Sequence, residues 1–103
     1  MYIYSVTVFI DKDAETNWLD FMQQKHISDV LKTGFFTKAC MRKVVKHTDA
    51  DKSVYKIEYY CKDKESYQTY ATTAASALQK DVADRFAGRF NAERVLLEEI
   101  FEI

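Results

Sequence analysis

The 103-residue sequence contains no proline, only two glycines and only two cysteines. It also has no low-complexity tract and no run of like charge that would mark a linker, so we expect a single domain over residues 1–103. Two cysteines without a Cys-x-x-Cys motif or a Cys/His spacing indicate free thiols rather than a disulfide framework or a zinc site. We expect no metal and no cofactor.

An excess of charge of one sign is also missing. The formal net charge is −1, with 15 Lys and Arg against 16 Asp and Glu, which gives no general attraction to nucleic acid or acidic membranes. No apolar run is long enough to cross a membrane, and the chain lacks an RNP-type RNA-binding motif. The apolar N-terminal segment has no basic residues before it and is followed by Asp11, Lys12 and Asp13, unlike a secretory signal. We therefore expect a cytoplasmic protein that binds neither nucleic acid nor membranes.

Apolar and aromatic residues, in contrast, are plentiful. Hydrophobic residues make up 48% of the chain and aromatic residues 15%, which is enough for a core without disulfides or metals. Residues 2–10 are rich in Tyr, Ile, Val and Phe and predict a β-strand. Both alternating sets of its side chains contain apolar residues, so we expect a central strand with both faces at least partly covered.

Residues 17–36 predict one amphipathic helix. At 100° per residue, one arc of the helix contains apolar residues and a histidine: Trp18, Leu19, Met22, His26, Ile27 and Val30. We expect Asp11 or Asp13 to cap this helix and Gly34 to end it in the left-handed conformation.

The remaining elements follow from the same kinds of pattern. We expect strands over residues 36–47 and 54–61 joined by the polar turn 48–53, a helix from Asp63 to Gly88 that bends within 72–77, and a final strand over 90–103. A hairpin centred between Ala50 and Asp51 sets Cys40 against Cys61. It also sets Lys43 against Glu58, a favourable cross-strand pair.

The resulting order is strand, helix, strand, strand, helix, strand. Two such β-α-β units indicate an α+β, ferredoxin-like βαββαβ fold, and right-handed crossovers place both helices on one face of a four-stranded antiparallel sheet. The opposite face would then expose apolar side chains, which usually marks an interface. We therefore predict a homodimer packed through the open sheet face, the dimeric α/β-barrel arrangement.

The chain resembles a family of short, uncharacterised bacterial proteins, a "domain of unknown function" group with this dimeric barrel-like fold. The matching residues are Ile3-Tyr4-x-Val6-Thr7-Val8, Trp18-Leu19-x-Phe21-Met22, His26-Ile27, Val30-x-x-Thr33-Gly34-x-Phe36, Tyr59-x-Cys61, Tyr67-x-x-Tyr70 and Arg85-Phe86-x-Gly88-x-Phe90. The family pattern has Trp where this chain has Phe21 and Pro where it has Ser28. The resemblance covers nearly the whole chain and implies a fold rather than an activity. By fold alone the chain is also similar to cofactor-free monooxygenases and EthD-type proteins.

His26 is the candidate catalytic residue, because its ring points toward the predicted core near Trp18, Met22 and Phe86. An ordinary histidine at the edge of the core, hydrogen bonded to a carbonyl or a tyrosine, explains the same pattern. Asp29, one turn further along the helix, is placed to orient the imidazole and raise its pKa.

A small-molecule pocket beside His26 is the second candidate feature. Seven tyrosines are many for this length, and aromatic walls with a few hydroxyls describe both a ligand pocket and a dimer interface. Arg42, expected on an apolar strand face, would either anchor an anionic ligand or pair with a carboxylate such as Glu93 or Glu98. The candidate ligand-binding residues are Trp18, Met22, His26, Arg42, Tyr59, Tyr67 and Phe86.

Two functions are compatible with these features. The first is a non-catalytic dimeric module that binds a small apolar or aromatic molecule or supports assembly. The second is a cofactor-independent enzyme of the monooxygenase or EthD type, with His26 as general base beside Trp18 and Tyr59 or Tyr67. An open cavity at His26 with a free ring nitrogen would favour the enzyme, and a closed core around a satisfied ring would argue against it.

Overall fold

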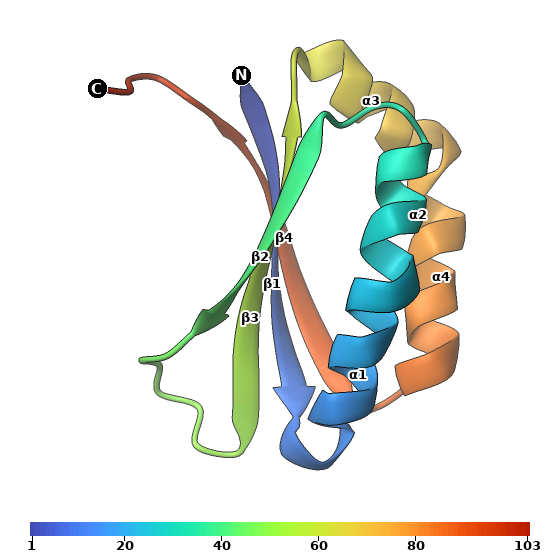
Figure 1. The fold of residues 1–103 in the computed structure, drawn as a ribbon, viewed down its shortest axis with the longest axis vertical. Coiled ribbons are helices and arrows are strands. Elements are labelled where there is room, and N and C mark those ends of the chain that lie inside the picture. Colours follow the sequence, from blue (N-terminus) through green and yellow to red (C-terminus); the bar gives the residue numbers. More distant parts are fainter.

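In the computed structural model, which describes residues 1–103, a four-stranded antiparallel sheet has its helices on one face (Figure 1). The strands are β1 (Tyr2–Asp11), β2 (Lys38–Val44), β3 (Lys52–Cys61) and β4 (Phe90–Glu98), in the spatial order β2-β3-β1-β4. The α-helices are α1 (Glu15–Phe21), α2 (Ile27–Lys32), α3 (Lys64–Thr73) and α4 (Ala75–Phe86). The predicted ferredoxin-like βαββαβ fold is confirmed.

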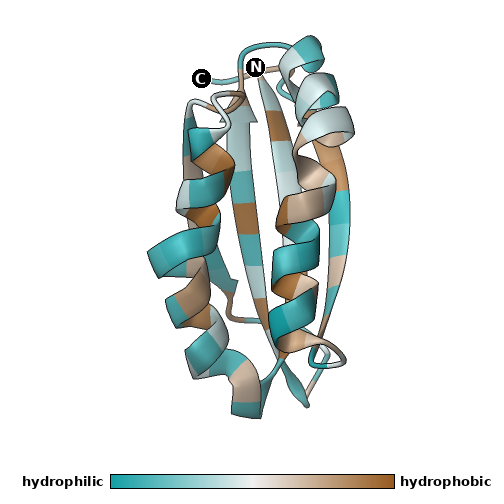
Figure 2. Cartoon of the chain, turned by 90° about the vertical axis from the view of Figure 1, so that its right-hand side faces the viewer, coloured by the Kyte–Doolittle hydropathy of each residue, from teal (hydrophilic) through white to brown (hydrophobic).

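Strand β1 is the centre of the sheet, because it pairs with β3 on one side and with β4 on the other. Tyr4 and Val8 of β1 are buried beneath the helices, opposite Tyr59 and Tyr55 of β3. The two helical segments, α1–α2 and α3–α4, lie side by side in one layer over this face of the sheet (Figure 2). On the other face Ser5 is also buried, which agrees with the expectation of a strand covered in part on both faces.

The predicted register of the β2–β3 hairpin is wrong by three residues. Met41 lies opposite Ile57, and Lys43 lies opposite Tyr55 rather than Glu58. An odd shift moves every β2 side chain to the other face of the sheet. The observed register places Met41 against the core. Met41 is partly buried there. It gains part of the roughly 1.5–3 kcal/mol that complete burial of such a side chain contributes, whereas an exposed ion pair contributes only about 0.2–1 kcal/mol.

The register also corrects the predicted positions of Cys40 and Arg42. Cys40 lies opposite Glu58 instead of Cys61, and both cysteines are free thiols. Arg42 lies on the open face, where its Nη1 donates to a Glu58 carboxylate oxygen at 3.1 Å. The carboxylate partner expected from Glu93 or Glu98 is therefore Glu58.

The first helix is continuous from Glu15 to Lys32, but it is not α-helical throughout. A π-helical turn, Met22–His26, joins α1 to α2, and the Ile27 amide donates to the Met22 carbonyl five residues earlier. Gly34, with φ of 84°, ends the helix as predicted. The predicted cap by Asp11 or Asp13 is wrong, because neither carboxylate accepts a capping hydrogen bond. Asp11 pairs instead with Lys52 and Arg89, and Asp13 pairs with Arg89.

The second helical region agrees with its predicted limits. The Asp63 carboxylate accepts a hydrogen bond from the Ser66 amide at 2.8 Å, which caps α3. The helix breaks at Ala74, within the predicted bend, and Gly88 follows α4 with φ of 74°. Strand β4 ends at Glu98 rather than at Ile103, because its partner β1 begins at Tyr2, opposite Glu98.

A carboxylate fixes the start of the first helix to the sheet. Glu15, the first residue of α1, accepts hydrogen bonds from the hydroxyls of Ser53 (2.8 Å) and Tyr55 on β3. Lys43 of β2 adds an ion pair at 3.4 Å. These donors lower the pKa of Glu15, while burial and the Glu15 carboxylate raise the pKa of Tyr55 to about 12.

The face of the sheet opposite the helices is open, as predicted. It exposes Val95 (53%) and Leu97 (42%) of β4, and the register also places Ile3, Phe9 and Tyr60 on it. None of the helices is long and apolar enough to cross a membrane.

Candidate functional site

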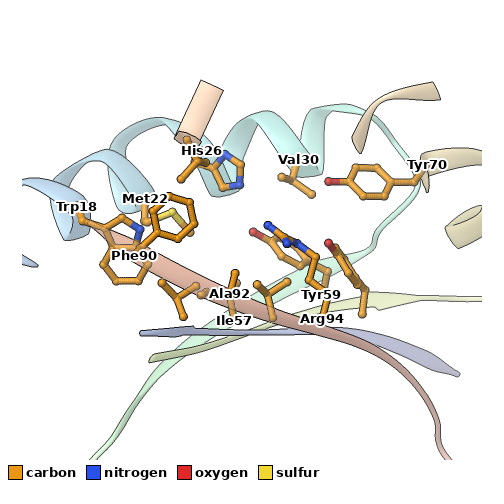
Figure 3. Close-up of a pocket in the computed structure, with 14 residues that line it drawn as sticks. Trp18, Met22, His26, Val30, Ile57, Tyr59, Tyr70, Phe90, Ala92 and Arg94 are labelled. Carbon is orange, nitrogen blue, oxygen red and sulfur yellow. The ribbon is translucent and has the colours of Figure 1, made fainter. Parts of the chain in front are cut away.

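A pocket lies between the first helix and the helix-covered face of the sheet (Figure 3). Its cavity volume is about 40 Å³, and its mouth is open to solvent. Twelve of its fourteen lining residues are hydrophobic, and none is Asp or Glu. The lining residues are Tyr4, Val6, Val8, Trp18, Met22, His26, Val30, Ile57, Tyr59, Tyr70, Val82, Phe90, Ala92 and Arg94.

The roof of the pocket comes from the first helix. Trp18, Met22, His26 and Val30 recur every four residues and point toward the sheet (Figure 3). The π-helical turn covers the interval from Met22 to His26. Such turns are rare and occur often at functional sites, because the extra residue in the turn shifts the side chains that follow it. The helical periodicity predicted this wall correctly.

His26 faces the pocket without a hydrogen-bond partner at Nδ1. This nitrogen is buried and unsatisfied, and the ring lies 5.8 Å from the Phe21 ring centroid to centroid. Burial lowers the pKa of His26, and this effect exceeds the opposing influence of the Asp81 and Asp29 carboxylates. The imidazole is therefore neutral at pH 7 and can accept a proton.

The expected partnership between His26 and Asp29 is absent, and the expectation of a raised His26 pKa is wrong. Asp29 instead accepts a hydrogen bond from Lys25 at 2.5 Å. Asp81 of α4 pairs with Lys25 at 3.3 Å and with Arg85 at 3.1 Å. Both carboxylates next to His26 are thus engaged with cations, and desolvation of the ring dominates.

Tyrosines form the wall at one end of the pocket. The Tyr4 ring lies 5.8 Å from those of Tyr59 and Tyr70 and 5.3 Å from that of Tyr67. Burial raises the pKa values of Tyr4, Tyr59 and Tyr70, so their hydroxyls stay protonated and can donate hydrogen bonds.

The structure gathers four of the seven predicted ligand-binding residues around the pocket: Trp18, Met22, His26 and Tyr59. Tyr67 and Phe86 lie one layer further out, where Tyr67 packs on Tyr4 and Phe86 packs on Phe21 at 5.7 Å. Arg42 is on the opposite face of the sheet and takes no part in the pocket.

Sequence reasoning missed the arginine that does line the pocket, Arg94 of β4. It lies opposite Val6 of β1, on the same face of the sheet as Phe90 and Ala92. The signal was present in the alternation of β4, which places every second residue from Phe90 on the side of the helices. Arg94 is also an exposed residue, so it stands at the mouth of the pocket.

We predict that His26 makes stability depend on pH below its ordinary pKa of 6.5. The folded protein resists protonation of His26, whereas the unfolded chain takes up a proton near the ordinary pKa of 6.5. Stability is therefore greatest above that value and falls as the pH decreases, by at most about 1.4 kcal/mol per pH unit. Urea denaturation of His26→Gln should give a flatter profile than wild type. His47→Gln, in an exposed turn, is the control, and a His26→Gln profile as steep as that of wild type would contradict the assignment.

Comparison with known proteins agrees with this fold. Solved structures similar to the chain include an ethyl tert-butyl ether D (EthD) family protein from Bacillus halodurans, with TM-score 0.67, 16% identity, and coverage of 97% of this chain and 100% of that one. SnoaB from Streptomyces nogalater, described as a cofactor-independent oxygenase, has TM-score 0.66 and 12% identity, with 99% and 96% of the two chains covered. A dimeric ferredoxin-like protein from an uncultured marine organism has TM-score 0.68 and 12% identity, with 100% and 98% covered.

At such identities these likenesses concern the fold alone. No curated protein matches the sequence. Residues 1–100, in contrast, match the family described as a domain of unknown function (DUF4286). The chain therefore belongs to the DUF4286 family.

Proposed function

We propose that the protein binds a small aromatic or largely apolar molecule in the pocket between the first helix and the sheet. One observation carries this proposal: a concave site with apolar walls onto which an imidazole, a guanidinium and tyrosine side chains converge. Ligand sites are typically built in this way, with a few polar groups that orient a molecule held mainly by apolar contact.

The size of the pocket determines how such a ligand would lie. The cavity volume of about 40 Å³ accommodates a few water molecules and is smaller than the range of about 300–1,000 Å³ that ligand sites occupy. A ligand of one or two rings would therefore extend from the cavity into the open mouth beside the exposed Arg94.

The unpartnered Nδ1 of His26 favours a second candidate function, a cofactor-independent enzyme with His26 as general base. A neutral imidazole in an apolar site can remove a proton from a bound molecule, and a general base typically contributes about 10²–10⁴-fold to a rate. Trp18 and Tyr59 would hold the substrate beneath the ring, and Arg94 would stabilise the anion that forms. SnoaB, which has a similar fold, is described as a cofactor-independent oxygenase.

We also propose that the protein is a homodimer packed through its open sheet face. Val95 and Leu97 expose apolar surface there, and Arg42 and Glu58 form an ion pair within the same face. A sheet face of this kind is commonly covered by a partner. The similar protein from a marine organism is described as dimeric.

Two unpaired cysteines fit a reducing compartment such as the cytoplasm.

Ligand binding can be tested with small bicyclic aromatic compounds. Trp18 is the only tryptophan and lines the pocket, so its fluorescence reports occupancy directly. We expect some of these compounds to quench Trp18 and raise the melting temperature together. Ala92→Phe, which fills the pocket, should lose both effects, while Asn91→Phe, on the opposite face of the same strand, should keep them. A panel in which no compound does both would refute the proposed pocket.

The proposed base can be tested by hydrogen exchange at carbon. 2-Tetralone is a bicyclic ketone with acidic protons next to its carbonyl, and their exchange in D₂O is followed by NMR. We expect the wild-type protein to accelerate this exchange, and His26→Gln to lower the acceleration by about 100-fold or more. His47→Gln should behave as wild type. Equal rates for wild type and His26→Gln would remove His26 from any catalytic role.

The dimer can be tested by sedimentation. We expect wild type to be dimeric at micromolar concentration and Leu97→Lys to be monomeric, because a charge at the interface opposes burial of the face. Ala83→Lys, exposed on α4, is the matched control. Alkylation of Cys40, which lies on the open face, should be faster in Leu97→Lys than in wild type. A stable wild-type monomer would exclude this interface.

A further inference from the structure

We propose that the ligand of this pocket is an aromatic acid, whose anionic oxygen group is bound by Arg94 and whose aromatic body lies beneath the first helix. This inference rests on the proposed function, since it specifies the chemistry of the molecule that the pocket takes. It concerns an arginine to which neither the sequence patterns nor the family match gives a role.

The pairing of the arginines singles out Arg94. The chain has four, and three have carboxylate partners within its own fold: Arg42 with Glu58, Arg85 with Asp81, and Arg89 with Asp11 and Asp13. Arg94 has no carboxylate within 4 Å of its guanidinium, and it is the arginine that lines the pocket. Its charge is therefore available to a bound anion. A guanidinium matches a carboxylate with two parallel hydrogen bonds.

The tyrosines beside Arg94 add hydroxyl groups that can donate hydrogen bonds to a carboxylate. Elsewhere in the chain, Tyr2 and Tyr55 donate their hydroxyls to the carboxylates of Glu98 and Glu15. The hydroxyls of Tyr59 and Tyr70 donate to no carboxylate and no backbone carbonyl of the chain. In Figure 3, Arg94, Tyr59 and Tyr70 extend into the same end of the pocket from three different elements, β4, β3 and α3.

The charged residues around the pocket favour a negatively charged ligand. No acidic residue lines it, so an anionic group would meet no repulsion from the walls. The position of Arg94 at the mouth also matters, because a partly exposed cation can pair with an anion without the full cost of burying both charges. The other end of the pocket, with Trp18 and Phe90, offers only aromatic and apolar surface to the body of the ligand (Figure 3).

This arrangement would place the ligand in one orientation. The anionic group lies toward Arg94, Tyr59 and Tyr70, and the ring system lies toward Trp18, Met22 and Ile57. His26, in the roof of the pocket, would then face the ring system rather than the acid group. A neutral imidazole can be buried there without the cost of desolvating a charge.

The test compares 1-naphthoate with 1-naphthamide, two ligands of nearly the same shape that differ in charge. Titrations are followed by quenching of Trp18. We expect wild type to bind naphthoate about 10- to 100-fold more tightly than naphthamide, as charge-assisted hydrogen bonds typically allow. Arg94→Gln should remove this difference by weakening naphthoate alone, and Arg94→Lys should keep part of it. Arg42→Gln changes the net charge by the same amount on the other face and should keep the wild-type difference.

The outcomes separate the two levels of the proposal. If neither compound binds to wild type, the proposed pocket itself is wrong. If both bind to wild type with equal affinity, or if Arg42→Gln weakens naphthoate as much as Arg94→Gln does, the pocket stands and the anion site is refuted. The affinity of Arg94→Gln for naphthamide reports whether the pocket of this variant is intact. If the variant does not fold, the ratio of the two affinities in wild type still decides whether the pocket prefers an anionic ligand.

Discussion

The hydrogen bonds that Tyr55 and Ser53 donate to Glu15 fix the geometry on which the candidate site depends. They tie the first residue of α1 to β3, and three residues later Trp18 packs on the ring of the same Tyr55, with centroids 5.1 Å apart. A helix held at its start by both polar and apolar contacts has little freedom to turn about its axis. The residues that follow at four-residue intervals, Met22, His26 and Val30, therefore face the sheet in a defined order.

The two faces of the sheet differ in how their polar side chains are paired. On the covered face, apolar burial leaves a pocket with few polar groups, among them a His26 Nδ1 without a hydrogen-bond partner. On the open face, polar side chains pair with one another, as Arg42 does with Glu58, among exposed apolar residues. Proteins with this fold carry descriptions as different as an EthD family protein and a cofactor-independent oxygenase. A shared fold therefore does not determine the function, which depends on the residues of the site.

Much of this architecture was predictable from residue patterns, because the patterns report burial. The alternation in β1, the helical arc through Trp18 and His26, and the glycine stop at Gly34 all follow from local geometry. The β2–β3 register was not predictable, since a longer connection between the strands allowed the apolar pair Met41 and Ile57 to determine it.

Because of that error, Arg42 was proposed as the anchor for an anionic ligand, whereas the structure places Arg94 at the pocket. With β2 shifted by three residues, Arg42 was placed beneath the helices, while the alternation that brings Arg94 there was not followed along β4. The lowered pKa of His26 was missed for a related reason. It follows from burial of the ring between the first helix and the sheet, which outweighs the nearby Asp81 and Asp29 carboxylates and which no spacing along one helix reveals.

The π-helical turn at Met22–His26 has an evolutionary consequence. It contains one residue more than an α-helical turn would need, so a relative with one residue fewer in this segment could keep the same fold and the same helix faces on either side of the turn. In such a relative, only the residues within the turn would present their side chains differently. A different residue would then stand where His26 stands. An alignment of the hydrophobic pattern alone would not reveal such a one-residue deletion. Counting the residues in this turn would therefore separate relatives that keep a histidine at the pocket from relatives that keep only the fold.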